Sequence, residues 1–156
     1  MKQVTLVIPA YNEEKRIRPA ATALFSDPLL KKKCQFLFIV DGTDRTGEIL
    51  EGMKKHGADV SVKRYAERLG KGGAVSEGIM AAETEYVGFV DVDSSVPVGI
   101  VGKIIGMLTE EKLDCVIGNR VKVEGAPFTR KFSSKAFNTL VNLLFGLGIS
   151  DTQCGC

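Results

Sequence analysis

The sequence lacks tryptophan, has one histidine and five prolines among its 156 residues, and carries a formal net charge of only +2. This near-neutral balance excludes a nucleic-acid-binding protein that depends on a strongly positive surface. Neither an internal repeat nor a Pro/Ser-rich linker divides the chain. With 44% apolar residues, we therefore expect one continuous globular domain.

The chain also lacks the charged and apolar pattern of a secretory signal. Reduced thiols are therefore favoured over a disulfide framework, and we expect a protein that faces the cytoplasm. The pair Cys154-x-Cys156 is too sparse for a metal site by itself. The four cysteines are Cys34, Cys115, Cys154 and Cys156.

No apolar run reaches the roughly 20 residues that cross a bilayer. The run from Leu140 to Ile149 is about half that length, and it follows a basic and aromatic segment that begins at Phe128. Its length favours a helix packed in the core. A basic, amphipathic helix in the membrane interface is the alternative.

Short apolar runs alternate with stretches of helical length and period. This alternation predicts an α/β fold with a mainly parallel central sheet and helices on both faces. The predicted strands are Val4 to Ile8, Phe36 to Val40, Val60 to Val62, Tyr86 to Val90 and Cys115 to Ile117. The predicted helices are Glu13 to Phe25, Thr46 to His56, Gly72 to Ala82 and Pro97 to Leu108.

In such a sheet, ligands bind beyond the carboxyl ends of the strands. Carboxylates follow three of the predicted strands, and Gly118-Asn-Arg follows a fourth. Asp91-Val-Asp93 is the sharpest local signal, because carboxylates two residues apart at a strand end can hold one Mg²⁺ or Mn²⁺. Two acids in a polar turn are the alternative.

Asp41 ends a very apolar run, which suggests an acceptor for ribose hydroxyls or base nitrogens. Helix capping explains Asp44 better than it explains Asp41. Gly70-Lys-Gly-Gly lacks the hydroxyl of a phosphate-binding Walker loop, and no Gly-x-Gly-x-x-Gly follows the first strand. We expect a glycine turn that opens a helix, with Lys71 near a nucleotide.

Taken together and in order, these motifs resemble the inverting glycosyltransferases of family 2, in the branch of dolichyl-phosphate mannose and glucose synthases. The matching segments are Val7 to Glu14, Asp41-Gly-Thr-Asp, Gly70-Lys-Gly-Gly-Ala, Asp91-Val-Asp, Gly118-Asn-Arg and Ser150-Asp-Thr-Gln-Cys-Gly. Two positions depart from the family pattern. A single acid, Asp41, stands where paired acids are usual, and Asn119 replaces a serine.

The resemblance implies a GT-A, Rossmann-like fold that binds a nucleotide sugar. It implies transfer of a sugar from a GDP-mannose or UDP-glucose type of donor to a polyprenyl or dolichyl phosphate, with inversion and with Mg²⁺ or Mn²⁺ as cofactor. The expected donor-binding residues are Pro9, Tyr11, Glu13, Asp41, Lys71, Asp91, Val92, Asp93 and Arg120. The expected catalytic residues are Asp91, Asp93, Arg120 and Asp151, the metal ligands are Asp91, Asp93 and Ser95, and the acceptor-binding residues are Arg130 and Lys131.

A phosphate acceptor is already largely ionised at pH 7, so it needs no general base, and Asp151 is then expected to position it. A sugar hydroxyl would need Asp151 as a base. Transfer to a hydroxyl, nucleotidyl transfer and nucleotide-sugar binding without turnover remain the alternatives. No nucleic-acid partner is expected.

A lipid acceptor also changes the interpretation of the segment after Phe128, which we then expect to lie at the cytoplasmic face of a membrane. Residues 1–120 are expected to form the donor part of one catalytic domain. Residues 121–156 are expected to begin the acceptor part and to be truncated. The oligomeric state stays open, with a homodimer as one alternative.

Overall fold

A four-stranded parallel sheet forms the centre of the computed structural model, which describes residues 2–54, 58–93, 96–119, 128–146, 148–149, 151 and 154–156. Within residues 128–136 it describes the backbone alone. The strands are β1 (Val4–Ala10), β2 (Cys34–Val40), β3 (Val60–Arg64) and β4 (Tyr86–Phe89). Their order across the sheet is β3-β2-β1-β4, and all neighbours are parallel.

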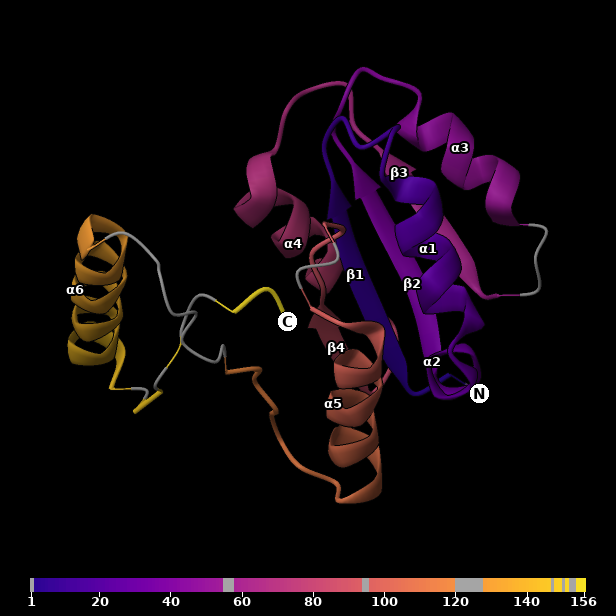
Figure 1. Ribbon diagram of the computed structural model, residues 1–156. Helices are drawn as coiled ribbons and strands as arrows, with labels where there is room; N and C mark the ends of the chain where they lie inside the picture. The colour runs from indigo at the N-terminus through magenta and orange to yellow at the C-terminus, as the bar shows by residue number, and fades with distance from the viewer. Residues whose placement is uncertain are drawn as a thin grey trace. The chain divides into compact units, whose positions relative to one another are not determined.

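Helices cover both faces of this sheet, as the sequence predicts (Figure 1). They are α1 (Ile17–Ser26), α2 (Pro28–Lys33), α3 (Thr46–Met53), α4 (Gly70–Met80) and α5 (Val98–Glu110). A further helix, α6 (Phe128–Phe145), follows later in the chain.

Alternating side chains of the strands supply the two faces of the core. Leu6 and Phe38 point to a large cluster that α1, α2, α3 and α5 complete, whereas Val7 and Ile39 point to a smaller cluster with Ala74 of α4. Because both faces are covered, β1 and β2 are apolar at nearly every position rather than at every second one.

Gly78 allows α4 to pack directly on β1. A Cβ atom at this position would lie 2.8 Å from Cγ2 of Val7 and still closer to its Cγ1, so a side chain here would displace the helix. The close packing brings the N-terminal end of α4 to the carboxyl end of the sheet, where ligands bind in folds of this kind.

The structure corrects three predictions about elements. Among the described residues, Cys115 to Ile117 form no strand, and Cys115 and Ile117 are exposed. Helix α1 begins at Ile17 rather than at Glu13, because residues 14–16 form a turn. The short helix α2 was not predicted, although Asp27 caps it and Pro28 occupies its first turn.

The chain divides into two compact units. The first comprises Met1–Val116 together with Gly155–Cys156, and the second comprises Ile117–Cys154. The first unit contains the whole sheet, so the last two residues return to the body that carries the strands. Among the residues that the structure describes, none of the helices combines the length and the apolar character that crossing a membrane requires.

Candidate nucleotide-sugar site

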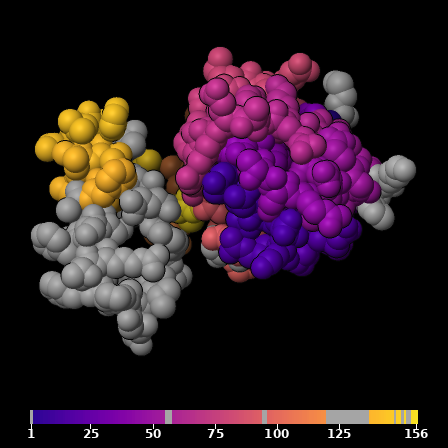
Figure 2. Space-filling model, turned by 90° about the horizontal axis from the view of Figure 1, so that it is seen from above, coloured from indigo at the N-terminus to yellow at the C-terminus, as the bar shows by residue number. Residues whose placement is uncertain are grey.

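The candidate site lies where the strand order changes direction. Chain connections run from β1 outward to β2 and β3, and then return to β4 on the other side of β1. Loops that leave β1 and β4 therefore separate at this point and open a crevice beyond the strand ends. Figure 2 looks onto this end of the sheet, where atoms of the N-terminal segment, in indigo, lie beside atoms of the later segments, in magenta.

A cavity of about 340 Å³ occupies the crevice. It brings together eight residues that the sequence analysis assigned to the donor: Pro9, Tyr11, Glu13, Asp41, Lys71, Asp91, Val92 and Asp93. Ala10, Arg68, Gly70 and Ala74 complete its lining. A larger hollow of about 570 Å³ lies between α2 and α5, but none of the predicted site residues lines it.

Asp41 is almost fully buried at the floor of the cavity, with 4% of its surface exposed. Its Oδ2 atom accepts hydrogen bonds of 2.9 Å from the backbone N–H groups of both Leu69 and Gly70. The carboxylate thus caps the N-terminal end of α4, where it also stabilises the positive end of the helix dipole. Capping explains Asp41 after all, although the helix is α4 rather than the next one along the chain.

Lys71 enters the cavity from the first turn of α4. Gly70 has a φ of +69°, a conformation that glycine adopts without strain and that allows the chain to turn sharply into the helix. The Lys71 ammonium lies 2.7 Å from Oδ2 of Asp91. The two side chains are 57% and 22% exposed, so this ion pair is accessible to a ligand.

Tyr11 and Arg68 also line the cavity, and the guanidinium of Arg68 lies over the Tyr11 ring, 4.2 Å from its centre. A nucleobase can stack on an aromatic ring or on a guanidinium plane, so the pair offers two surfaces of the right kind. Arg68 was not among the predicted site residues, because it lies in an exposed segment between β3 and α4 that carries no periodic pattern. Its position just before the Gly-Lys-Gly-Gly turn was the available signal.

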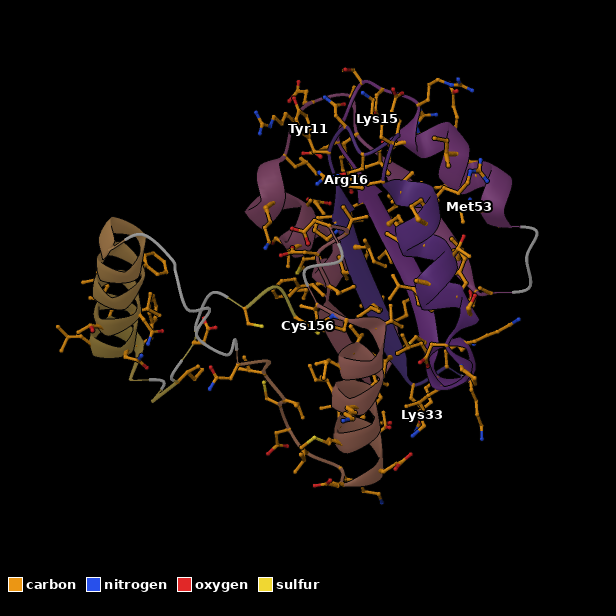
Figure 3. All side chains as sticks on the ribbon, in the orientation of Figure 1. Tyr11, Lys15, Arg16, Lys33, Met53 and Cys156 are labelled. Atoms are coloured by element: carbon orange, nitrogen blue, oxygen red, sulfur yellow. The ribbon has the colours of Figure 1, made fainter. Side chains whose placement is uncertain are left out.

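Glu13 lines the cavity but is already paired. Its carboxylate accepts two hydrogen bonds of 2.8 Å from Arg16, and its backbone N–H donates to the hydroxyl of Thr46. Figure 3 labels Arg16 with Tyr11 and Lys15 at the carboxyl end of the sheet, opposite Lys33. Glu13 thus helps to fix the loop after β1, whatever else it contacts.

Asn12 joins the loops after β1 and β2. Its φ of 52° turns the chain, and its side-chain oxygen accepts hydrogen bonds from the backbone N–H groups of Thr43 and Asp44, at 3.0 and 3.3 Å. Gly42 lies so close that a Cβ atom there would be 2.5 Å from the same oxygen. The two loops therefore form one rigid wall of the cavity.

The carboxylates that follow β4 fit a divalent cation of the Mg²⁺ or Mn²⁺ type. Both line the cavity, Asp93 is exposed, and oxygen atoms are the donors that such hard cations prefer. Within the described ranges, no group of three or more His, Cys, Asp or Glu side chains could hold a metal ion. Two carboxylates suit a cation that completes its shell with water and phosphate oxygens of a substrate.

The structure does not test several of the predicted site residues. Arg120 and Ser95 lie outside the described residues, as do the side chains of Arg130 and Lys131. Asp151 is described, half-buried, and belongs to the unit Ile117–Cys154. The roles of these residues stay predictions.

Helix α6 in that same unit carries exposed apolar side chains near its end, including Leu143, Leu144 and Phe145 at 80%, 67% and 69% exposure. The chain then turns at Gly146, and the side chain of Asn142 forms hydrogen bonds with Ile149 after the turn. Its side-chain oxygen accepts from the N–H of Ile149 at 2.9 Å, and its amide donates to the Ile149 carbonyl at 2.8 Å. The predicted helix after Phe128 is thus present.

Known proteins with similar sequences include dolichyl-phosphate beta-glucosyltransferases. One from Trichomonas vaginalis is 30% identical over 97% of this chain and 50% of its own length. Another, from Mus musculus, is 31% identical over 99% of this chain and 53% of its own length. The chain therefore spans about half the length of the curated relatives that it matches.

Solved structures with a similar fold include complexes with a nucleotide or a nucleotide sugar. A mannosyltransferase from Pyrobaculum calidifontis, in complex with GDP-Man and Mn²⁺, superimposes with a TM-score of 0.61 at 21% identity, covering 69% of this chain and 32% of that one. S. aureus TarS 1-349, in complex with UDP, gives a TM-score of 0.62 at 22% identity over 78% of this chain and 38% of that one. These likenesses confirm the predicted GT-A architecture of a parallel sheet covered by helices.

The family model of glycosyl transferase family 2 matches residues 5–156, which is nearly the whole chain. The loop after β1, the cavity residues and the segment that ends at Cys156 all lie within this match. The chain belongs to glycosyl transferase family 2.

Proposed function

We propose that the chain binds a nucleoside-diphosphate sugar in the cavity at the ends of β1 and β4 and transfers the sugar, with inversion, to dolichyl or polyprenyl phosphate. The observation that carries this proposal is the convergence of Tyr11, Lys71, Asp91 and Asp93 on one cavity. The names of the relatives support glucose as the sugar and dolichyl phosphate as the acceptor.

Two groups of side chains in the cavity lining suit the two parts of the donor. Tyr11 and Arg68 offer flat surfaces for a base, whereas Lys71 and the carboxylates of Asp91 and Asp93 offer charge for a diphosphate and its cation. Mg²⁺ or Mn²⁺ held by Asp91 and Asp93 would supply charge neutralisation for the departing nucleoside diphosphate. In the bound state, we expect Lys71 to leave Asp91 for a phosphate oxygen.

The acceptor decides what further groups the reaction needs. A lipid phosphate is already ionised near pH 7, so it can attack without a general base. Arg130 and Lys131 are proposed to hold that phosphate, since arginine binds phosphate oxygens in a bidentate fork. Asp151 is proposed to position the acceptor, and Arg120 to balance the charge of the leaving diphosphate.

Helix α6 is proposed to rest on the cytoplasmic face of the membrane that holds the acceptor. Its exposed Leu143, Leu144 and Phe145 supply the apolar contact, and the basic residues earlier in the helix supply attraction to anionic lipid. Sedimentation with anionic vesicles tests this assignment, and unchanged binding of a Leu143→Glu, Phe145→Glu variant would contradict it. The oligomeric state stays open, with a homodimer as one alternative, and light scattering measures it.

Calorimetry tests the donor site directly. UDP, GDP, UDP-glucose and GDP-mannose are each titrated with and without Mn²⁺. We expect binding that requires the cation and that weakens by at least about tenfold when Asp91 and Asp93 are both changed to Asn, since charged contacts to the ligand are lost. Asp59→Asn, an exposed acid away from the cavity, is the control. Equal affinity of the double variant and the wild type would contradict the assignment of Asp91 and Asp93 to the donor site.

A transfer assay separates the alternatives that share this site. Radiolabelled sugar that appears in an organic-phase lipid phosphate supports the proposal. Transfer to a sugar hydroxyl, or pyrophosphate release from a nucleoside triphosphate, would indicate the competing enzymes. Binding without any turnover would indicate a nucleotide-sugar-binding module. Arg130→Ala with Lys131→Ala is expected to spare donor binding and to reduce lipid transfer.

A further inference from the structure

Gly155, the penultimate residue of the sequence, lies against Asp91. The backbone N–H of Asp91 donates a hydrogen bond of 3.0 Å to the carbonyl of Gly155. Gly155 is buried, and Cys156 packs against the larger core cluster of the first unit. Figure 3 labels Cys156 at this end of the chain. The contact therefore joins a candidate metal ligand to residues more than 60 positions later in the sequence.

There is no room for a side chain at Gly155. A Cβ atom built there would lie 3.0 Å from Cγ of Asp91 and 3.4 Å from its Cβ, and it would collide with Oδ2. The backbone of Gly155 does not have a positive φ, unlike that of Gly70, Gly146 and Gly148. The requirement for glycine is therefore steric, and it is set by the carboxylate of Asp91.

Lys71 contacts the same oxygen atom of Asp91, Oδ2. The ammonium of Lys71 lies 2.7 Å from Oδ2 of Asp91, and Lys71 lines the cavity. The main chain of Asp91 is thus fixed by the Gly155 carbonyl. Its Oδ2 atom contacts Lys71 and is also the atom nearest to the Cβ position at Gly155. Because the side chain is only 22% exposed, it has few other directions to turn.

We propose that Gly155 is a positioning residue of the donor site, which keeps the Asp91 carboxylate turned into the cavity by presenting bare backbone to it. The inference rests on the proposed function, since it takes Asp91 as a ligand of the cation that accompanies the diphosphate. A side chain at residue 155 would push Oδ2 aside, and the cation and diphosphate would lose their correctly placed partner. The nucleoside end of the cavity would be untouched.

Unchanged binding of the nucleoside distinguishes a positioning role of Gly155 from a merely structural one. A general loosening of the fold would weaken every ligand, whereas a displaced Asp91 weakens only ligands that need the cation. UDP and GDP carry the diphosphate that is proposed to bind together with Mn²⁺. Uridine and guanosine carry no phosphate and are measured without metal. The ratio of the two affinities is thus the informative readout.

The experiment compares Gly155→Ala with Gly52→Ala, a helix position where an added Cβ meets nothing within 4 Å. For Gly155→Ala we expect the affinity for UDP or GDP with Mn²⁺ to fall by about tenfold or more, a range that displaced charged contacts span. We expect its affinity for the free nucleoside to stay close to that of Gly52→Ala. The Mn²⁺ concentration for half-maximal binding is expected to rise.

Should Gly155→Ala fold poorly, the variant Lys71→Ala, Gly155→Ala gives the carboxylate space to turn aside and is compared with Lys71→Ala alone. We expect the double variant to bind UDP or GDP with Mn²⁺ about tenfold or more weakly than Lys71→Ala does, with equal affinity for the free nucleoside, and equal affinities for the diphosphates would overturn the inference.

Wild-type affinity of Gly155→Ala for the diphosphates would overturn the inference while leaving the proposed function intact, provided that Asp91→Asn loses binding. Equal weakening of nucleoside and diphosphate would also overturn it. Unchanged binding by Asp91→Asn, or no binding of diphosphates to the wild type, would overturn both proposals together.

Discussion

Asp41 combines a structural task with a place in the candidate site. Its buried Oδ2 accepts from the N–H groups of Leu69 and Gly70, so the first turn of α4 is attached to the end of β2. Lys71 is the next residue, and its position at the cavity depends on that attachment. A substitution of Asp41 is therefore expected to reduce both stability and donor affinity, and an effect on binding alone cannot define its role.

Asp44 fixes the neighbouring loops and makes their stability depend on pH. Burial raises the pKa of its carboxyl, but hydrogen bonds from the Thr46 side chain and from the N–H groups of Glu14 and Thr46 outweigh burial and hold that pKa below the ordinary value of 3.8. The stabilisation is complete above the ordinary pKa. It is lost as the pH falls through the lower pKa of the folded state.

We predict that Asp44→Asn flattens the acid side of the stability profile. The wild type should lose part of its free energy of unfolding as the pH falls from above 3.8 through the lower pKa of the folded state, and the variant should lose less, because it has no carboxylate to protonate. Urea unfolding followed by circular dichroism measures both. Asp59→Asn, an exposed acid, is the control. Parallel profiles for wild type and Asp44→Asn would contradict the assignment.

At the scale of the helices, α4 determines how the site is assembled, and Gly78 determines how α4 packs. The missing Cβ at Gly78 leaves room for both methyl groups of Val7. Gly72 in the same helix has nothing within 4 Å of an added Cβ. The two glycines therefore offer a matched comparison of steric effects within one element.

We predict opposite effects for these two alanine substitutions. Gly78→Ala should destabilise the protein by about 1–3 kcal/mol, the usual range for overpacking. Gly72→Ala should stabilise it by about 0.5–1 kcal/mol, because alanine loses less backbone entropy in a helix. Denaturant unfolding measures both changes. A neutral Gly78→Ala would mean that α4 does not lie on β1 as described.

The central strands and most of the helices could be predicted because burial on both faces makes β1 and β2 continuously apolar. The three-residue run at Cys115 has the same composition, but a strand also needs a neighbour to pair with, and a sequence does not display that. Helix α2 escaped prediction because six residues are too few to show a helical period. Its Asp-Pro start was the remaining signal.

For the candidate site, the residues after the strand ends could be predicted, because parallel strands place their carboxyl ends together. Eight of the residues assigned to the donor do line one cavity. Arg68 and Gly155 could not be found in this way. Arg68 contacts the Tyr11 ring, and Gly155 contacts the backbone and the carboxylate of Asp91. Such contacts appear only when distant segments are folded together.

For the molecule as a whole, Cys34 reports on the integrity of the core. It is fully buried at the start of β2, and burial raises the pKa of its thiol from 9.0 to about 12, against opposing effects of Lys2 and Lys33. The thiolate is the form that reacts with alkylating reagents. Cys34 is therefore protected in two ways, because burial keeps reagents out and because its thiol stays protonated. Cys115 is exposed.

We predict that iodoacetamide at about pH 8 labels Cys115 rapidly and leaves Cys34 unlabelled until the core opens. Mass spectrometry of peptides gives the labelled fraction of each thiol. With increasing urea, labelling of Cys34 should follow the loss of circular dichroism signal. Rapid labelling of Cys34 in buffer would show that the core around β2 opens locally.

The strand order also governs how the chain emerges from a ribosome. β1 pairs with β2 on one side and with β4 on the other, and Tyr86, the partner of Val4, is synthesised about 80 residues later. At roughly 5–20 residues per second, one edge of this apolar strand waits about 4–16 s for its neighbour. The nascent chain thus exposes the unpaired apolar edge of β1 before the candidate cavity has formed. A chaperone that covers β1 during those seconds would increase the yield of folded protein.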